Sequence, residues 1–343
     1  MAVASFGGNN AVKFDDLGMP SIMVGIPKMK YSDIITGGTQ ETLPWWIVDG
    51  VEKEVIWVSK YINVVVNDRA YSLPMKDPKA YIDFDTALAV CRRKGEGWHL
   101  MTNTEFVYLL HEAEEMGRTI GGNTNHGSNA DNPQEKGVVY DSAGRTLTGC
   151  DPLTWSHDGT AGGVFGICGN FWEFVTGLRL HKGVVEYTKD NDAAVEGYTE
   201  KPDWTVAEVN GRPLKLYGNS AGDVVMSVAE EIEENWEGCH MADLQLEELD
   251  EVPEIAYKLG IVPHDWKNET AGIWADSELE EAVPFRGSGF GDTSGGGAGA
   301  LHLYGARSGV YHYVSFRSAL FLESWELVTD LLKAGAKAHA GAQ

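Results

Sequence analysis

The pattern of apolar and polar residues predicts two helices early in the chain. The first covers residues 83–94. Asp83 or Asp85 can accept hydrogen bonds from its first N–H groups, and Gly95 stands where a left-handed residue ends a helix. The second covers residues 103–116 and, as its apolar spacing shows, has one face that we expect to be buried.

This second helix also carries a start signal. Thr102 and Glu105 have the T-x-x-E spacing of a capping box, in which each side chain binds the backbone N–H of the other residue. Gly117 follows its end. The apolar positions that recur at helical spacing are Phe106, Leu109, Leu110 and Ala113.

Short runs of β-forming residues predict strands before and after the helices. Residues 21–26 (SIMVGI) form one, and in residues 45–66 the pair Asp49-Gly50 between β-formers predicts a hairpin. Residues 171–175 predict another strand, in which Trp172 is more readily explained as a core anchor than as a ligand contact. Residues 121–144 lack periodicity and predict a loop.

Three segments fall outside this pattern. Residues 1–20 are rich in Gly and Asn and predict a loose N-terminal arm. Residues of about 185–282, hereafter the acidic segment, are dense in Glu and predict a solvated helical insertion, with Pro253 opening one helix. Residues 323–343 predict a C-terminal helix, capped by Ser324, and a tail.

The stretch 284–320 has an unusual composition. It combines many Gly and Ser residues with Tyr and His, and between Gly287 and Leu322 it contains no Lys, Glu, Gln, Trp or Met. Antigen-binding loops favour a similar mixture, because Tyr supplies rigid contact area at low entropic cost while small residues adapt. The composition therefore indicates a binding surface.

Charge and cysteine content exclude several classes of function. The net charge of -24 disfavours nucleic acid and anionic membrane surfaces as partners. The four cysteines, Cys91, Cys150, Cys168 and Cys239, lack metal-finger spacing, and we expect free, mostly buried thiols. The N-terminus shows no signal-peptide pattern, and no apolar run is long enough for membrane insertion.

Four motifs in order resemble the formylglycine-generating-enzyme family, a variant of the C-type lectin fold. They are LMTNTEF at 100–106, GNFWEF at 169–174, RGSGF at 286–290 and SFR at 315–317. The resemblance implies an α+β, C-type-lectin-like fold of the formylglycine-generating-enzyme type with much irregular loop, filling residues 21–322. Its oxidases use cysteines in their C-terminal part, and this chain has none after Cys239.

A narrower resemblance is to the variable proteins of diversity-generating retroelements of gut phages and bacteria. It rests on WHLMTNTEF, TWSHDGT, GNFWEFVTGLRL and the framework PFRG…ARS…FRSAL. In that group template adenines are rewritten, so that asparagine codons ending in a pyrimidine scatter to other residues. Such codons cannot encode the five residue types that the stretch lacks. The absence of Asn is compatible with heavy mutagenesis.

The resemblance implies a solvent-facing variable window at about 286–317. Its framework includes Trp172, Arg286, Gly287 and Arg317. The ligand-binding positions implied are Ser288, Phe290, Gly291, Asp292, Ser294, Gly295, Gly297, His302, Tyr304, Gly305, Gly309, Tyr311, His312, Tyr313 and Ser315.

Strand alternation predicts which of these side chains point inward, as framework, and which point outward, as contacts. Leu301 and Leu303 would point inward and His302 and Tyr304 outward. Tyr311 and Tyr313 share a face that we expect to be exposed. Val310, Val314 and Phe316 would supply the apolar face, and His312 has their parity.

The spacing of the same residues disfavours two other functions, phosphate binding and metal binding. The Gly-rich run has no GK[ST] and is not a phosphate loop. His302 and His312 lack metal-ligand spacing, so exposed contacts are expected rather than a metal site. Metal ligands stay unassigned; no cofactor is expected, although structural calcium is compatible with the fold.

The expected function is therefore non-enzymatic binding of a protein or glycan receptor on a host or target cell. The protein would lie on a virion, at the tail or surface, or on a cell surface, and a homo-oligomer is compatible with that role. The alternatives are a formylglycine-generating-type oxidase or related metalloenzyme, and a structural virion protein without a specific ligand.

Overall fold

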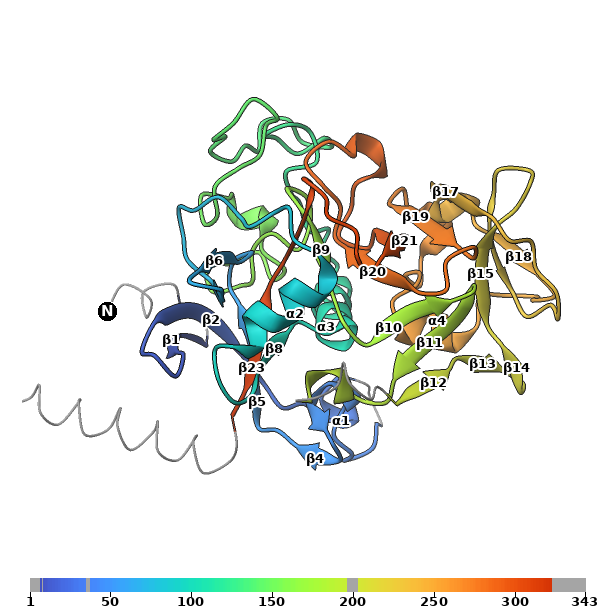
Figure 1. Cartoon of the computed structure of the whole chain (residues 1–343), viewed down its shortest axis with the longest axis horizontal. Helices are drawn as coiled ribbons and strands as arrows, with labels where there is room; N and C mark the ends of the chain where they lie inside the picture. Colours follow the sequence, from blue (N-terminus) through green and yellow to red (C-terminus); the bar gives the residue numbers. More distant parts are fainter. Residues whose placement is uncertain (1–6, 8, 35–37, 196–202, 323–343) are drawn as a thin grey trace, which may run out of the picture.

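The computed structural model describes residues 7, 9–34, 38–195 and 203–322, and this part of the chain is mostly β with few helices (Figure 1). Its four α-helices are α1 (Tyr31–Ile34), α2 (Phe84–Arg92), α3 (Asn103–Glu115) and α4 (Glu254–Lys258). The C-terminal helix expected from Ser324 lies outside the described residues.

Both predicted N-terminal helices are confirmed, together with their caps. Asp83 accepts a hydrogen bond from the Thr86 N–H at 2.7 Å, which holds the first turn of α2. The capping box of α3 is complete, because Thr102 and Glu105 each accept a hydrogen bond from the other's backbone N–H. The buried face of α3 packs against the first sheet through Phe106 and Leu109.

The first sheet joins the two ends of the described chain. Its order is β1 (Asn10–Phe14), β2 (Pro20–Pro27), β5 (Val55–Ser59), β23 (Ser318–Phe321) and β8 (Trp98–Leu100), and Figure 1 shows β1 and β2 in the same layer as β23. The predicted strand at 21–26 is confirmed as β2. The expectation of a loose arm is wrong for residues 10–14, which pair with β2 from Asn10↔Val24 to Phe14↔Pro20. Backbone pairing holds this strand, and composition does not reveal it.

The second sheet carries the variable window. Its main path is β17 (Trp236–His240), β19 (Gly272–Asp276), β21 (Leu301–Ala306), β20 (Ala282–Arg286), β10 (Leu178–His181), β11 (Val184–Thr188), β15 (Lys215–Gly218), β16 (Val224–Ser227) and β18 (Gln245–Glu247). Three further strands pair beside this path: β12 (Trp204–Val206) with β11, and β9 (Trp172–Phe174) with β20 and with β22 (Val314–Phe316).

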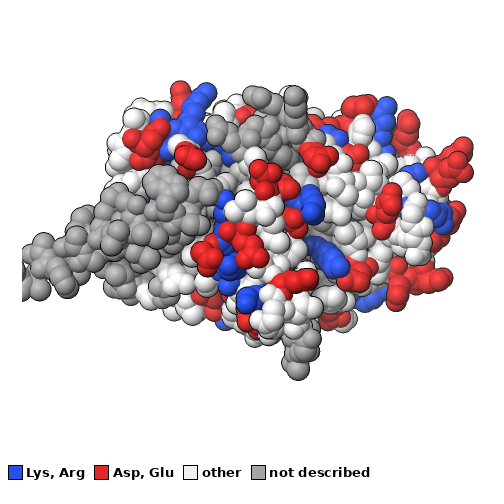
Figure 2. Space-filling model, turned by 90° about the horizontal axis from the view of Figure 1, so that it is seen from below, with Lys and Arg blue, Asp and Glu red and all other residues white. Residues whose placement is uncertain are grey.

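The acidic segment is therefore folded as β-structure, and the prediction of a helical insertion is wrong except for α4. Many of its apolar residues, among them Leu216, Met226 and Ile273, are buried in a core that this segment shares with β10, β20 and β21. Its described Glu side chains lie outside that core, in loops, on strands and, for Glu254, on α4. Figure 2 shows acidic side chains spread over one face of the protein, with Lys and Arg between them.

Three short hairpins complete the described strands. They are β3 (Ile47–Val48) with β4 (Val51–Glu52), β6 (Val64–Val66) with β7 (Arg69–Tyr71), and β13 (Glu208–Val209) with β14 (Arg212–Pro213). The first confirms the turn predicted at Asp49-Gly50. Residues 121–144 contain only isolated bridges, as expected for a loop.

Candidate ligand-binding surface

The variable window begins and ends at two fully buried arginines. The Arg286 guanidinium donates to Asn103 Oδ1 from Nε and Nη2, at 2.9 and 2.7 Å. It also donates to the carbonyl oxygens of Leu259 (2.9 Å) and Gly260 (2.6 Å). No carboxylate of the described residues pairs with it, and burial lowers the pKa of Arg286 to about 9. The cation is held by neutral acceptors alone.

Arg317 closes the window in a different way. Its Nε and Nη2 bind the two oxygens of the buried Glu173 carboxylate at 2.7 and 2.5 Å. The same guanidinium donates to the carbonyl oxygens of Ser59, Phe165 and Gly166. The bidentate pair connects the end of the window to β9. The carbonyl contacts connect it to the first sheet and to the loop before β9.

Gly287 and Trp172 occupy framework positions that tolerate little change. Gly287 has a φ of 89°, and a Cβ there would overlap the carbonyl oxygen of Ile167. Trp172 is 4% exposed and lies edge-on to Trp274, with ring centroids 5.6 Å apart. The interpretation of Trp172 as a core anchor agrees with this burial.

Between the arginines, the window forms two connections on the second sheet. One, residues 287–300, joins β20 to β21 and includes a short 3-10 turn at Thr293–Gly295. The other, residues 307–313, joins β21 to β22. Strand β22 runs parallel to β9, which pairs Ser315 with Glu173 and brings the second connection back beside the first.

The aromatic side chains of the window gather into one continuous group with a neighbour from the acidic segment. We call the group formed by Tyr304, Tyr311, His312, Tyr313 and Trp236 the ring surface. The three tyrosines are half-buried, His312 is exposed, and Trp236 is 51% exposed. Ring centroids lie 5.7 Å apart for Trp236 and Tyr304, 5.3 Å for Tyr311 and Tyr313, and 5.1 Å for His312 and Tyr313.

Tyr304 and Tyr313 complete this group, because their phenol groups lie close enough for each to affect the pKa of the other. Burial raises the pKa of both phenols, so the pair is neutral and polar at neutral pH. Asp292 of the first connection lies near enough to add to the rise for both. The ring surface thus presents flat apolar faces with hydroxyl and imidazole edges, which suits contact with a polar partner.

Five of the fifteen predicted positions are buried, and the expectation that they face solvent is wrong. They are Ser288, Phe290, His302, Gly305 and Ser315. The other ten are exposed or half-buried: Gly291, Asp292, Ser294, Gly295, Gly297, Tyr304, Gly309, Tyr311, His312 and Tyr313. Each buried position has a structural cause.

His302 does point away from Leu301 and Leu303, as strand alternation predicts, but that face of β21 is also covered. Its ring stacks on Phe285 with centroids 4.5 Å apart and contacts Trp172. Burial lowers the pKa of His302 well below its ordinary value, and Nε2 has no hydrogen-bond partner among the described residues. His302 is a neutral core residue.

The remaining four serve the frame. Ser288 Oγ accepts hydrogen bonds from the N–H groups of Gly169 (3.2 Å) and Gly297 (3.1 Å). The Phe290 ring packs beside Phe171, and a Cβ at Gly305 would lie 2.8 Å from Cε1 of Phe285. Ser315 is buried on β22, in register with Glu173.

The alternation of buried and exposed side chains that the sequence predicts does not hold in the second connection. Val310 is 52% exposed rather than part of an apolar face, and His312, which shares its parity, is exposed as well. The reason is that β22 begins only at Val314, so that residues 307–313 turn instead of alternating. His312 therefore has the exposure that a contact residue needs.

Sequence reasoning missed Trp236 because it lies outside the window. It stands in a Glu-rich run on β17, whose pairing with β19 places it beside β21. A large aromatic residue in an otherwise solvated segment was the available signal.

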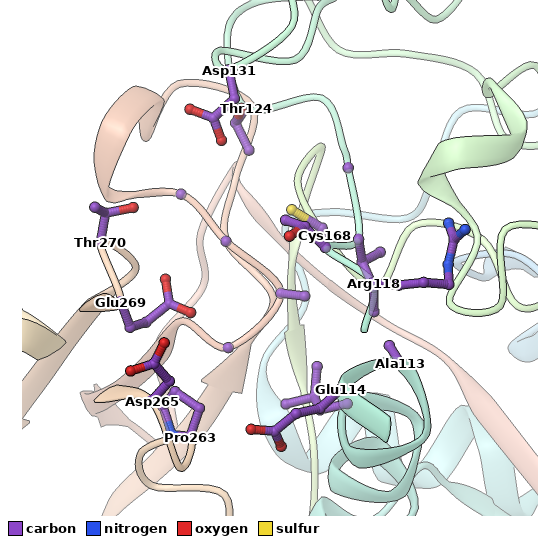
Figure 3. A pocket seen from close by; sticks show the side chains of 18 of the residues that line it. Ala113, Glu114, Arg118, Thr124, Asp131, Cys168, Pro263, Asp265, Glu269 and Thr270 are labelled. Carbon is purple, nitrogen blue, oxygen red and sulfur yellow. The ribbon is translucent and has the colours of Figure 1, made fainter. Parts of the chain in front are cut away.

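A cavity lies against the first connection (Figure 3). It encloses about 510 Å³ between α3, the loop that follows it, the loop after α4, and Gly296–Gly299 of the window. This volume is in the range of small-ligand sites. Of the predicted positions, Gly297 lines it.

The cysteines are free, as expected, but only Cys91 and Cys168 are buried; Cys150 and Cys239 are half-buried. Burial raises the pKa of Cys168 to about 12 and that of Cys239 to about 11. Both thiols are therefore protonated at neutral pH, whereas redox and metal chemistry use the thiolate.

Within the described ranges, no three His, Cys, Asp or Glu side chains are grouped so that they could hold a metal ion. The compatibility with structural calcium stays a prediction. No helix in the same ranges is both long and apolar enough to cross a bilayer.

Comparison with known proteins gives one similarity of interest. No family model matches the chain, and no curated protein sequence matches it. Among solved structures it is similar to the Major Tropism Determinant P3c Variant, with 12% sequence identity and a TM-score of 0.31, over 92% of this chain and 72% of that one. A TM-score of 0.31 does not establish a common fold.

Proposed function

We propose that this chain is a non-enzymatic binding protein that recognises a protein or glycan receptor through the ring surface and the exposed part of the variable window. The observation that carries the proposal is the continuity of Tyr304, Tyr311, Tyr313 and Trp236 at the surface. They come from three separate segments and meet beside a frame whose arginines are fully buried.

The half-buried rings and the buried frame both suit a recognition surface. Half-buried tyrosines have few free torsions and are already packed, so that little side-chain entropy is lost when a partner covers them. The frame is held by Arg286, Arg317 and Trp172, none of which faces solvent. Substitutions at exposed window positions would then alter recognition at small cost in stability.

The burial of five window positions supports a smaller set of positions for diversification. The ten exposed or half-buried positions are the candidates for a variable site, whereas Ser288, Phe290, His302, Gly305 and Ser315 are buried. We propose that the five vary less than the ten. A virion tail or a cell surface would present many copies, and multivalent display raises the avidity of a weak single site.

Sequences of the same gene from related isolates test this proposal. We expect differences to concentrate at the ten positions, with a neighbouring reverse-transcriptase gene and an adenine-rich near-copy of the window. Differences spread evenly over the chain, with no such near-copy, would contradict diversification. Differences at the five buried positions as frequent as at the ten would contradict the division between frame and contact residues.

A further inference from the structure

The cavity beside the window has a strongly acidic lining. Carboxylates of Glu114, Asp131, Asp265 and Glu269 lie around it in Figure 3. A fifth carboxylate, Glu135, is used by the structure, because Asn129 Nδ2 and Trp155 Nε1 donate to its Oε2 at 3.1 and 3.0 Å.

Two of these carboxylates, Asp131 and Glu269, have oxygens that are available to a ligand. The Asp131 carboxylate is exposed and accepts no hydrogen bond from the described residues. Glu269 uses Oε1 to accept a hydrogen bond from the Ala271 N–H at 2.8 Å, which leaves Oε2. A Cβ at Gly299 would lie 3.9 Å from that oxygen, so Oε2 faces the window loop.

Arg118 does not neutralise this lining. It is the arginine that lines the cavity, but its guanidinium is turned away in Figure 3 and lies against Gly159, where a Cβ would overlap it. His111 is engaged with Glu114, at 3.3 Å between Nδ1 and Oε2. The electrostatic field inside the cavity is therefore set by the carboxylates.

The floor of the cavity is apolar. Leu110, Pro263 and Ala298 are half-buried and line it. An apolar floor below acidic groups matches a ligand with an aliphatic stem and a cationic head, as the side chains of Arg and Lys have. A metal ion matches less well, because it needs several ligands converging within coordination distance.

The cavity also borders the variable window. One of its walls is Gly296–Gly299, part of the stretch whose composition resembles that of antigen-binding loops. The same connection carries Asp292, which lies near Tyr304 and Tyr313 on the ring surface. The same loop thus contributes a wall of the cavity and lies near the ring surface.

We propose that this cavity is a second binding site, which takes a cationic Arg or Lys side chain of a peptide or protein between its apolar floor and the Asp131 and Glu269 carboxylates. This goes beyond the proposed function, because the cavity would take such a side chain whether or not the ring surface binds a receptor. The matched probes are acetyl-Gly-Arg-Gly-amide and its citrulline counterpart, which has nearly the same shape but no charge.

Calorimetric or NMR titration of the full chain with both peptides tests the proposal. We expect the arginine peptide to bind at millimolar concentration and the citrulline peptide to bind about tenfold more weakly, because a hydrogen bond gains strength when its partners are charged. Raising the salt concentration should weaken the arginine complex.

Variants separate a specific site from general attraction to an acidic protein. Asp131→Asn with Glu269→Gln should weaken arginine-peptide binding about tenfold, whereas Glu208→Gln with Glu234→Gln, exposed positions that do not line the cavity, should leave it unchanged. If the first pair proves unstable in a thermal melt, Asp131→Asn alone serves, because no hydrogen bond or ion pair joins that side chain to the described residues. Absent binding, equal binding of both peptides, or equal losses in both pairs of variants would overturn the proposal.

Discussion

Arg286 and Asn103 meet although 183 residues separate them in the chain, and one amide oxygen of Asn103 accepts two hydrogen bonds from the guanidinium. Asn103 is the first residue of α3, directly after the capping residue Thr102. Its Nδ2 donates to the Leu259 carbonyl oxygen at 3.0 Å. The start of α3 therefore fixes the start of the variable window and the end of α4 at the same point.

Asn103→Ala tests this anchor. We expect the free energy of unfolding to fall by about 3 kcal/mol or more, because two hydrogen bonds to a buried cation are lost and the cation keeps only carbonyl acceptors. Chemical denaturation measures the change, and the exposed Asn132→Ala serves as control. A loss below about 0.5 kcal/mol would show that water or other groups replace the amide.

Two glycines of the window should respond differently to the same substitution. Gly305→Ala places a methyl group against the Phe285 ring and should cost about 1–3 kcal/mol, whereas a Cβ at Gly295 meets nothing within 4 Å. Gly295→Ala should stay within about 0.5 kcal/mol of the wild type. Thermal and chemical unfolding of the pair provide the measurement; equal effects would mean that the window is not divided into frame and free positions.

Stability should depend on pH through His302. Burial lowers its folded-state pKa, so the unfolded chain takes up the proton first. The stability associated with neutral His302 is fully present above the unfolded pKa of about 6.5. As pH falls below that value, the free energy of unfolding decreases by up to about 1.4 kcal/mol per pH unit. His302→Phe should flatten the unfolding free energy between about pH 6.5 and pH 5. His312→Phe, at an exposed position, should keep the wild-type slope.

The ring surface can be tested directly. Tyr311→Ala with Tyr313→Ala should reduce binding of labelled protein to receptor-bearing cells at least tenfold, because central aromatic side chains supply a large share of interface energy. Both rings are half-buried, so each substitution should also lower the free energy of unfolding by about 1–2 kcal/mol.

The control for this experiment is Phe14→Ala, which removes a 60% exposed ring from β1, outside the window. It should leave cell binding unchanged. Unaltered binding by the double tyrosine variant would remove these rings from the contact surface. A loss of more than about 5 kcal/mol per ring would place them in the core.

The oxidase alternative makes a separate prediction. With the pKa of Cys168 near 12 and that of Cys239 near 11, we expect no oxygen consumption when the protein is mixed with a Cys-containing peptide. An oxygen electrode measures this, with thiol titration in denaturant as the check that all four cysteines are reduced. Oxygen uptake that disappears in Cys239→Ala would reverse the assignment.

Local signals could be read from the sequence. Asp83, Thr102 with Glu105, and Asp49-Gly50 act on backbone groups within a few residues, so their pattern predicted the start of α2, the capping box of α3 and the β3–β4 turn. The framework role of Arg286, Arg317 and Trp172 followed from a resemblance, and their burial agrees with it.

Which faces are covered was decided only in three dimensions. Alternation placed His302 opposite Leu301, but Trp172 and Phe285 arrive from β9 and β20 and bury it there. Charge density suggested a solvated helical segment, yet long-range strand pairing folds the same residues into a sheet and brings Trp236 to Tyr304. Short-range hydrogen bonding is encoded by neighbouring residues, whereas burial depends on partners distant in the chain, and the chain's own order does not reveal them.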